Sequence, residues 1–227
     1  MKRAFIYSIF LVISLGSYGQ ITKQPKDTIV CKGGNAKFSV NVTNIAVSFR
    51  WHKWNGTIWD TLNDVTPYSG VFTKTLVIKN VHDTLNSSLF KCKIDTNKVS
   101  INSSDSAKLS VNSLPTASIK GSTSVCQNAS PQSITLEGAN GTAPYTFRYK
   151  INGVSQTPVT TTVGNSVKLT VPTNNAGNYT YSLFFVVDAS TTACAQTQSD
   201  SASITVNPLP TATISASVSS VCQNASS

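Results

Sequence analysis

The sequence predicts an all-β protein made of small antiparallel β-sandwiches that follow one another along the chain. Three observations predict this fold class. The heptapeptide that begins at Ser124 returns unchanged at Ser220, about 95 residues later, which is the size of one small sandwich. Apolar and polar residues alternate in short runs, and no helical periodicity interrupts them. Prolines, among them Pro115 and Pro208, recur in short joints between the alternating regions, where they limit hinge freedom.

The first residues, 1–19, are expected to form a cleaved signal peptide. Lys2 and Arg3 precede an apolar stretch that is too short to cross a membrane as a helix, and small residues follow it. No comparable apolar run occurs later, so we expect no transmembrane segment in the mature chain. The expected localisation is secreted or cell surface. Five cysteines in an exported chain favour disulfides.

The first sandwich is expected over residues 20–112. Apolar residues two apart predict strands with one face toward a core. These residues are Ala36, Phe38, Val40 and Val42; Val47, Phe49 and Trp51; Leu76 and Ile78; Phe90 and Cys92; and Ala107, Leu109 and Val111.

The second sandwich is expected over residues 113–207, between joints at 112–115 and 207–210. Alternating apolar residues again predict half-buried strands, and Asn152-Gly153 predicts a tight hairpin. The strand positions are Ile134 and Leu136; Tyr145, Phe147, Tyr149 and Ile151; Val167, Leu169 and Val171; Tyr179, Tyr181 and Leu183; and Ala202, Ile204 and Val206. Residues 208–227 are expected to hold the first strand of a truncated third repeat.

The first region resembles an immunoglobulin-like domain. Trp51 corresponds to the core tryptophan of that family, and Phe90-Lys91-Cys92 stands in place of its Tyr-x-Cys. Val40 occupies the position of the usual second-strand cysteine. This shifted pattern is similar to the Ig-like repeats of large surface proteins of gliding bacteria, and the resemblance implies a disulfide between Cys31 and Cys92.

The second region resembles the repeats of gliding-motility adhesins and related PKD-like modules. The resemblance rests on residues 141–147 and 176–181, although the Trp-Asp-Phe-Gly-Asp-Gly signature of PKD domains is absent. It implies export and a disulfide between Cys126 and Cys194. Cys222 is expected to pair with a cysteine beyond residue 227, the alternative being a reactive thiol.

The sequence offers no catalytic constellation. His52 and His82 stand at expected strand and turn positions, and no Asp-x-Asp cluster or zinc spacing occurs. We therefore expect no enzyme activity, no cofactor and no metal site.

The candidate ligand-binding residues are His52, Trp54 and Trp59. If Asn55-Gly56 forms a two-residue turn, His52 faces Trp59, and the three side chains lie on the side opposite the core tryptophan. Two exposed tryptophans can stack on sugar rings. The alternative is that they brace the hairpin or pack against a neighbouring loop.

The formal charge of +9 falls mostly in the first sandwich, as scattered lysines. This pattern is typical of a solvated basic surface, with weak attraction to anionic glycans or DNA as the alternative. We expect no nucleic-acid partner.

The predicted function is that of a non-enzymatic extracellular or cell-surface repeat protein. It would act in adhesion or as a spacer that presents an adhesive region, with surface glycans or extracellular proteins as candidate partners. The alternative is a carbohydrate-binding accessory region of a larger exported hydrolase. A third interpretation is a spacer without any ligand.

Overall fold

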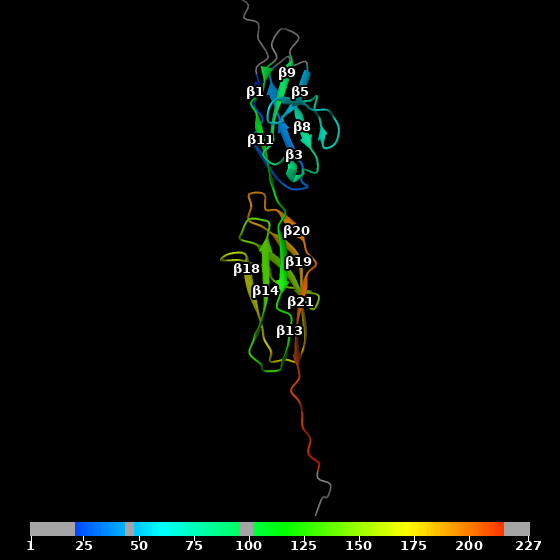
Figure 1. Cartoon of the computed structure of the whole chain (residues 1–227), viewed down its shortest axis with the longest axis vertical. Coiled ribbons are helices and arrows are strands. Elements are labelled where there is room, and N and C mark those ends of the chain that lie inside the picture. The colour runs from blue at the N-terminus through cyan, green and yellow to red at the C-terminus, as the bar shows by residue number, and fades with distance from the viewer. Residues whose placement is uncertain (1–20, 44–47, 96–101, 216–227) are drawn as a thin grey trace, which may run out of the picture. The chain divides into compact units, whose positions relative to one another are not determined.

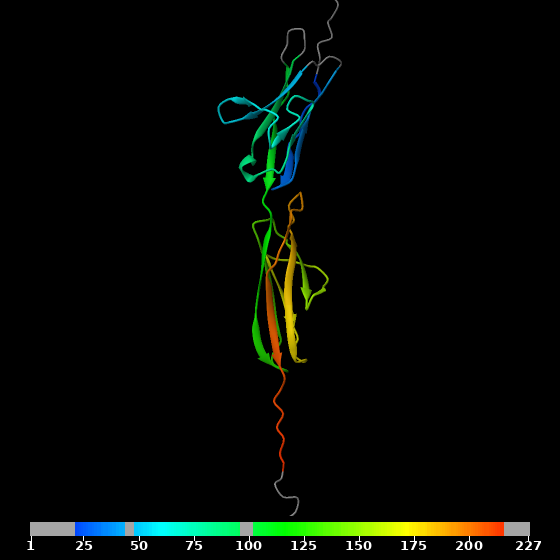
Figure 2. The same cartoon turned by 90° about the vertical axis from the view of Figure 1, so that its right-hand side faces the viewer.

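The computed structural model describes residues 21–43, 48–95 and 102–215. The chain divides into two compact units, Met1–Asn112 and Ser113–Ser227. The predictions for residues 1–19, Val47 and 216–227 lie outside the described residues. Two views at right angles show the described part of each unit as a set of paired strands (Figure 1, Figure 2).

The first unit is a sandwich of mainly antiparallel strands, and its described residues include one short 3-10 turn, Asp83–Leu85. Its strands are β1 (Ile21–Lys23), β2 (Thr28–Cys31), β3 (Ala36–Ser39), β4 (Asn41–Val42), β5 (Ser48–Trp54), β6 (Trp59–Thr61), β7 (Tyr68–Ser69), β8 (Thr75–Ile78), β9 (Leu89–Asp95), β10 (Asn102–Ser103) and β11 (Ala107–Asn112). One sheet has the order β2-β11-β9-β5-β6, with β10 beside β9, and the other has the order β3-β8-β7; β1 pairs with β4.

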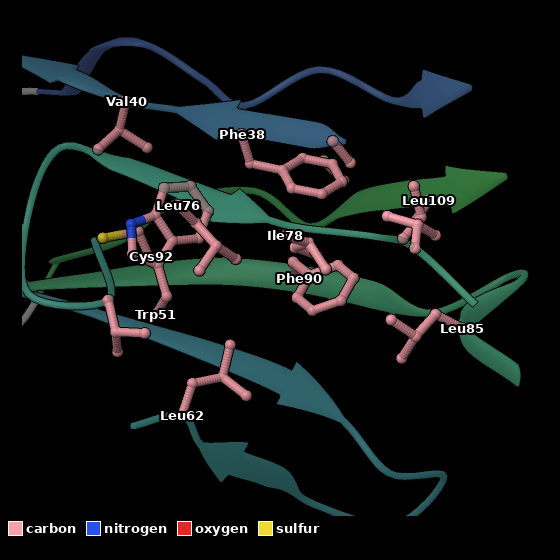
Figure 3. Close-up of a cluster of buried hydrophobic side chains, with 14 of the residues drawn as sticks. Phe38, Val40, Trp51, Leu62, Leu76, Ile78, Leu85, Phe90, Cys92 and Leu109 are labelled. Atoms are coloured by element: carbon pink, nitrogen blue, oxygen red, sulfur yellow. The ribbon is translucent and has the colours of Figure 1, made fainter. Parts of the chain in front are cut away.

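The core of the first unit lies between these sheets and contains most of the residues that alternate in the sequence, while Val42 and Phe49 are only partly buried at its margin. Trp51 is fully buried opposite Cys92 in the register of β5 and β9, and Figure 3 shows both in one cluster with Phe90. The indole N–H of Trp51 donates to the carbonyl of Thr73 at 3.0 Å, so the one polar atom of this large side chain is satisfied.

The second unit is built in the same way. Its strands are β12 (Thr116–Lys120), β13 (Thr123–Cys126), β14 (Gln132–Ala139), β15 (Thr146–Ile151), β16 (Val154–Ser155), β17 (Val159–Thr160), β18 (Ser166–Val171), β19 (Gly177–Val187), β20 (Ala195–Thr197) and β21 (Ser201–Asn207). One sheet has the order β13-β21-β19-β15-β16, with β17 beside β15 and β20 beside β19; the other has the order β12-β14-β18.

Both units share one topological detail that alternation alone does not predict. The second strand of each unit runs parallel to its last strand: β2 beside β11, and β13 beside β21. Cys31 lies level with Asn112 in the first unit, and Cys126 lies level with Asn207 in the second. The two cysteines therefore occupy equivalent positions in the two sandwiches.

The predicted hairpin at Asn152-Gly153 is confirmed. Ile151 pairs with Val154, and both turn residues have positive φ, at 48° and 84°. Such angles suit a two-residue turn that follows the natural twist of the strands.

A β-bulge in the second unit interrupts the predicted alternation. The register of β15 and β19 shifts between Arg148 and Tyr149, which face Phe185 and Leu183. The buried positions of β19 accordingly pass from Leu183 to Val186 instead of keeping a spacing of two.

The cysteine pairs expected from the resemblances are wrong. Cys92 and Cys126 carry free thiols, the first buried and the second exposed, whereas Cys31 and Cys194 are disulfide-bonded. Neither the Cys31–Cys92 pair nor the Cys126–Cys194 pair forms.

Strand pairing explains why Cys31 and Cys92 do not bond. Cys31 lies level with Asn112 of β11, while the other edge of β11 sets Ala107 level with Phe90. The two cysteines are therefore about seven residues, or roughly 20 Å, apart along the strand direction, and a disulfide requires Cα atoms about 4.4–6.8 Å apart.

Cys126 and Cys194 are separated even further. Cys126 lies level with Asn207, next to the start of β19, whereas Cys194 accepts a backbone hydrogen bond from Asp188, just past the end of β19. At about 3.3 Å per residue, the length of β19 places roughly 30 Å or more between them. Residues 208–215, where a third repeat was expected to begin, form no strand.

We predict that alkylation of the native chain distinguishes the free thiols of Cys92 and Cys126. Burial raises the pKa of the Cys92 thiol to about 11, so it is protonated and inaccessible until the unit opens. Iodoacetamide should modify Cys126 at least about a hundredfold faster than Cys92, with equal rates in denaturant. Peptide mapping by mass spectrometry measures both rates. A Cys31–Cys92 bridge in the non-reduced map would contradict the described strand register.

Candidate ligand-binding face

The outer face of strands β5, β6 and β9 gathers aromatic and cationic side chains. We call it the basic–aromatic face and define it by residues that lie opposite one another in the register. Its members are Arg50, His52 and Trp54 on β5, Trp59 and Thr61 on β6, and Lys91 and Lys93 on β9. Because side chains alternate along a strand, all of them point away from the core that holds Trp51.

The hairpin between β5 and β6 differs from the two-residue turn expected at Asn55-Gly56. Trp54 faces Trp59, and His52 faces Thr61. The side-chain carbonyl of Asn55 accepts hydrogen bonds from the backbone N–H groups of Thr57 and Ile58, each at 2.9 Å. This capping moves the turn along the chain, and Gly56 supplies the positive φ of 104°. The partner of each strand residue shifts by two, so the expected face is preserved.

The two tryptophans contact each other directly across the hairpin. Their ring centroids are 5.3 Å apart, and the ring planes are inclined by 53°. The Lys91 ammonium lies 4.3 Å from the centre of the Trp59 ring. Both rings are only half-buried. The pair therefore braces the hairpin, as the alternative interpretation expected, and still offers ring surface to solvent.

His52 is a buried polar residue on this outer face. Its side chain is only 5% exposed, because neighbouring side chains cover it. Its Nδ1 lies 3.5 Å from the Thr61 hydroxyl, and its Nε2 has no hydrogen-bond partner. The pKa of His52 is lowered, first by burial and then by the charge of Lys93. A hydrogen bond between the ring and the backbone of Trp59 opposes this shift, and Lys91 and Arg50 add smaller effects in the lowering direction.

An open hollow of about 340 Å³ adjoins His52. Its lining includes Ser48, Arg50, His52, Phe72, Lys93 and Asp95. The loop after β7 forms one side, held by a backbone hydrogen bond from Trp51 to Val71. The Arg50 guanidinium lies 4.6 Å from the centre of the Phe72 ring. The hollow thus combines two cations, one imidazole, one carboxylate and an aromatic wall.

Of the three residues that the sequence predicts for ligand binding, only His52 lines the hollow, and Trp54 and Trp59 belong to the same face outside its lining. The other lining residues are not predicted from the sequence. Arg50 lies two residues before His52 on the same strand, so alternation alone places it on the same outer face and could have predicted it as a candidate. Lys93 and Phe72 could not be predicted in this way, because their positions depend on the pairing of β9 with β5 and on the path of a loop.

The second histidine, His82, has a local structural contact. His82 lies in the turn before β9, where its Nδ1 caps Thr84 and contacts the carboxylate of Asp83. No group of three or more His, Cys, Asp or Glu suited to a metal occurs among the described residues. Within the same residues, no helix has the length and apolar character that a membrane crossing requires.

Comparison with known proteins is informative only at the level of structure. No known family matches the sequence, and no curated protein matches it. A structure of three titin Ig domains is similar, with a TM-score of 0.54 and 16% identity, over 84% of this chain and 66% of the titin fragment. A fragment of Down Syndrome Cell Adhesion Molecule with eight Ig domains gives a TM-score of 0.52 and 17% identity, over 84% of this chain and 27% of that one.

The chain has the fold of tandem immunoglobulin-like domains. At these identities the likeness concerns the fold alone. The narrower resemblance of the second immunoglobulin-like domain to PKD-like or gliding-adhesin repeats stays a prediction.

We predict that His52 makes the free energy of unfolding depend on pH. Its pKa is lowered in the folded chain, so below the unfolded value near 6.5 the unfolded state binds the extra proton. The stabilisation is complete above that pH and is lost as the pH falls through 6.5 toward the lowered value, with a slope of at most about 1.4 kcal/mol per pH unit. Urea unfolding between about pH 7.5 and 5 measures the loss.

The control for this prediction is the exposed His82. His52→Gln should flatten the pH dependence, and His82→Gln should leave the contribution of His52 intact. An equal slope in wild type and His52→Gln would show that burial of His52 does not govern it.

Proposed function

We propose that this chain is a non-enzymatic extracellular adhesion protein whose first immunoglobulin-like domain contacts surface glycans or extracellular proteins. One observation carries the proposal: the basic–aromatic face. Two tryptophans, three cations and a hollow lie together on one side of a single sheet. Tryptophan and arginine, both present on this face, are enriched at binding surfaces.

The serial organisation supports a spacing role for the domains. Only residues 113–115 separate the last strand of the first domain, β11, from the first strand of the second, β12. A short joint that contains Pro115 limits the conformational freedom between neighbours. In this proposal the chain is exported by its first 19 residues, and the segment from residue 208 begins a further repeat.

The proposal assigns no catalytic role to any residue. Its support is the sequence, in which His52 and His82 stand at strand and turn positions and the aspartates stand singly, without the acid–base pattern that a hydrolase needs. The second candidate function, a carbohydrate-binding region of a larger exported hydrolase, uses the same face. It differs in requiring a catalytic domain elsewhere in the full-length protein.

We predict that a glycan bound by the purified chain is lost or weakened when either tryptophan is removed. Trp54→Ala or Trp59→Ala should raise the dissociation constant by about three- to tenfold, because each ring contributes stacking surface. Glycan arrays identify the ligand, and calorimetry measures the constant.

The matched control is Ile58→Ala, which removes an exposed apolar side chain from the loop of the same hairpin. It should leave binding unchanged. Circular dichroism on each variant separates loss of binding from loss of fold. If the wild-type chain binds no glycan and no extracellular protein at millimolar concentration, the adhesive role is lost and the ligand-free spacer stands instead.

A further inference from the structure

We propose that the hollow beside His52 binds the carboxylate or sulfate group of an acidic sugar. The inference rests on the proposed function and deepens it, because it names the class of glycan and the side chains that select it. Arg50 and Lys93 would pair with the anionic group, His52 would donate to it, and Phe72 would contact the sugar ring.

His52 provides the first argument. Its Nε2 is buried and has no hydrogen-bond partner, although the ring borders the hollow. A buried polar atom without a partner is destabilising, so a ligand that supplies the partner gains the corresponding free energy. When Nδ1 accepts from the Thr61 hydroxyl, the ring proton stands on Nε2, which then donates to an anionic oxygen.

The cations provide the second argument. Neither Arg50 nor Lys93 forms an ion pair with another described residue; the ion pairs found there are Lys32–Asp83, His82–Asp83 and Lys120–Glu137. Arg50 is half-buried, with its guanidinium held beside Phe72. A guanidinium fixed in this way keeps its N–H groups ready for a carboxylate or sulfate, which match its fork geometry.

The other lining residues favour a sugar over a bare anion. Phe72 is 50% exposed, so one part of its ring surface is open to the C–H face of a sugar. Asp95 and Ser48 lie opposite each other where β5 and β9 adjoin the hollow. The Asp95 carboxylate can accept hydrogen bonds from sugar hydroxyl groups, and the Ser48 hydroxyl can accept from them or donate to them; a simple ion has no such hydroxyl groups. A volume of about 340 Å³ lies at the lower end of ligand sites and suits one sugar ring.

The second immunoglobulin-like domain offers an internal comparison. Its Arg148 also precedes a core aromatic residue, Tyr149, and lies 5.5 Å from the ring centre of Phe185. At the place that follows the core aromatic residue, this domain has Lys150 where the first has His52. The arginine–aromatic pair therefore recurs, whereas the buried imidazole belongs to the first domain.

The experiment titrates the full chain, labelled for detection of histidine rings by NMR, with defined probes. Glucuronate and glucose 6-sulfate carry the anionic group on a sugar, glucose lacks it, and acetate and sulfate lack the sugar. We expect both acidic sugars to shift the His52 signals and to bind at least about tenfold more tightly than glucose. They should also bind more tightly than acetate or sulfate, and affinity should fall as salt rises.

Binding should also couple to protonation of His52. An anion beside Nε2 favours the charged imidazolium, so affinity should increase as the pH falls from about 7 to 5.5. The charged groups around the ring are Arg50 on its own strand and Lys91, Lys93 and Asp95 on β9. The shift of the His52 titration on adding glucuronate reports the coupling directly.

Two variants and one matched control test the residue roles. Arg50→Ala should weaken glucuronate binding about tenfold or more, and Lys93→Ala, which alters an exposed side chain, about threefold. Arg148→Ala makes the same charge change in the second domain and should have no effect. Equal losses in Arg148→Ala would show that net charge alone drives binding and would overturn the assignment.

The outcomes separate this inference from the proposed function. Equal affinity for glucose and glucuronate would overturn the acidic-sugar site while leaving glycan adhesion intact. If the chain binds no glycan on an array but binds glucuronate saturably at His52, the result would support the acidic-group site in the hollow and refute adhesion to surface glycans. Preference for an acidic peptide or an oligonucleotide over every acidic sugar would overturn the ligand class.

Discussion

Burial of Trp51 is the constraint on which the rest of the first immunoglobulin-like domain depends. Its ring fills the space between the sheets opposite Cys92, and its N–H is held by the Thr73 carbonyl. Because side chains alternate along β5, placing Trp51 inward also places Arg50 and His52 outward. The binding face is therefore a direct geometric consequence of core packing. A shift of the β5 register by one residue would turn Trp51 out of the core and turn Arg50 and His52 away from the outer face.

The outer face holds a small buried layer of its own. His52 points away from the main core and is nevertheless almost inaccessible to water. This second burial lowers its pKa and leaves Nε2 unpaired. A buried polar atom without a partner costs about 1–3 kcal/mol, which the native state tolerates and which a ligand can recover. Arg50 is also partly removed from water on this face. The Phe72 ring beside its guanidinium offsets part of the lost hydration through a cation–π contact.

How far the sequence predicts the structure depends on the range of the interaction. Alternation identified the core faces of both domains, because the burial of residues such as Phe38 and Leu109 follows from the spacing of apolar residues within one strand. The turn after Trp54 was misplaced because the Asn55 side chain caps two backbone N–H groups, which a dipeptide rule does not include. The cysteine pairs failed for a different reason. Their separation is set by the register of β11 and β19, and no local pattern encodes register between distant strands.

The two immunoglobulin-like domains show how one topology carries different surfaces. Both run their second strand parallel to their last, and both bury an aromatic residue directly after an arginine. In the second domain the bulge in β19 leaves Phe184 and Phe185 beside Lys150 and Arg148, so aromatic rings accompany the cations there. The first domain instead has His52 and most of the positive charge of the sequence. Because both domains share the core pattern, their surfaces differ only at residues that core packing does not constrain. Such residues can vary without disturbing the fold and are therefore available to bind a ligand.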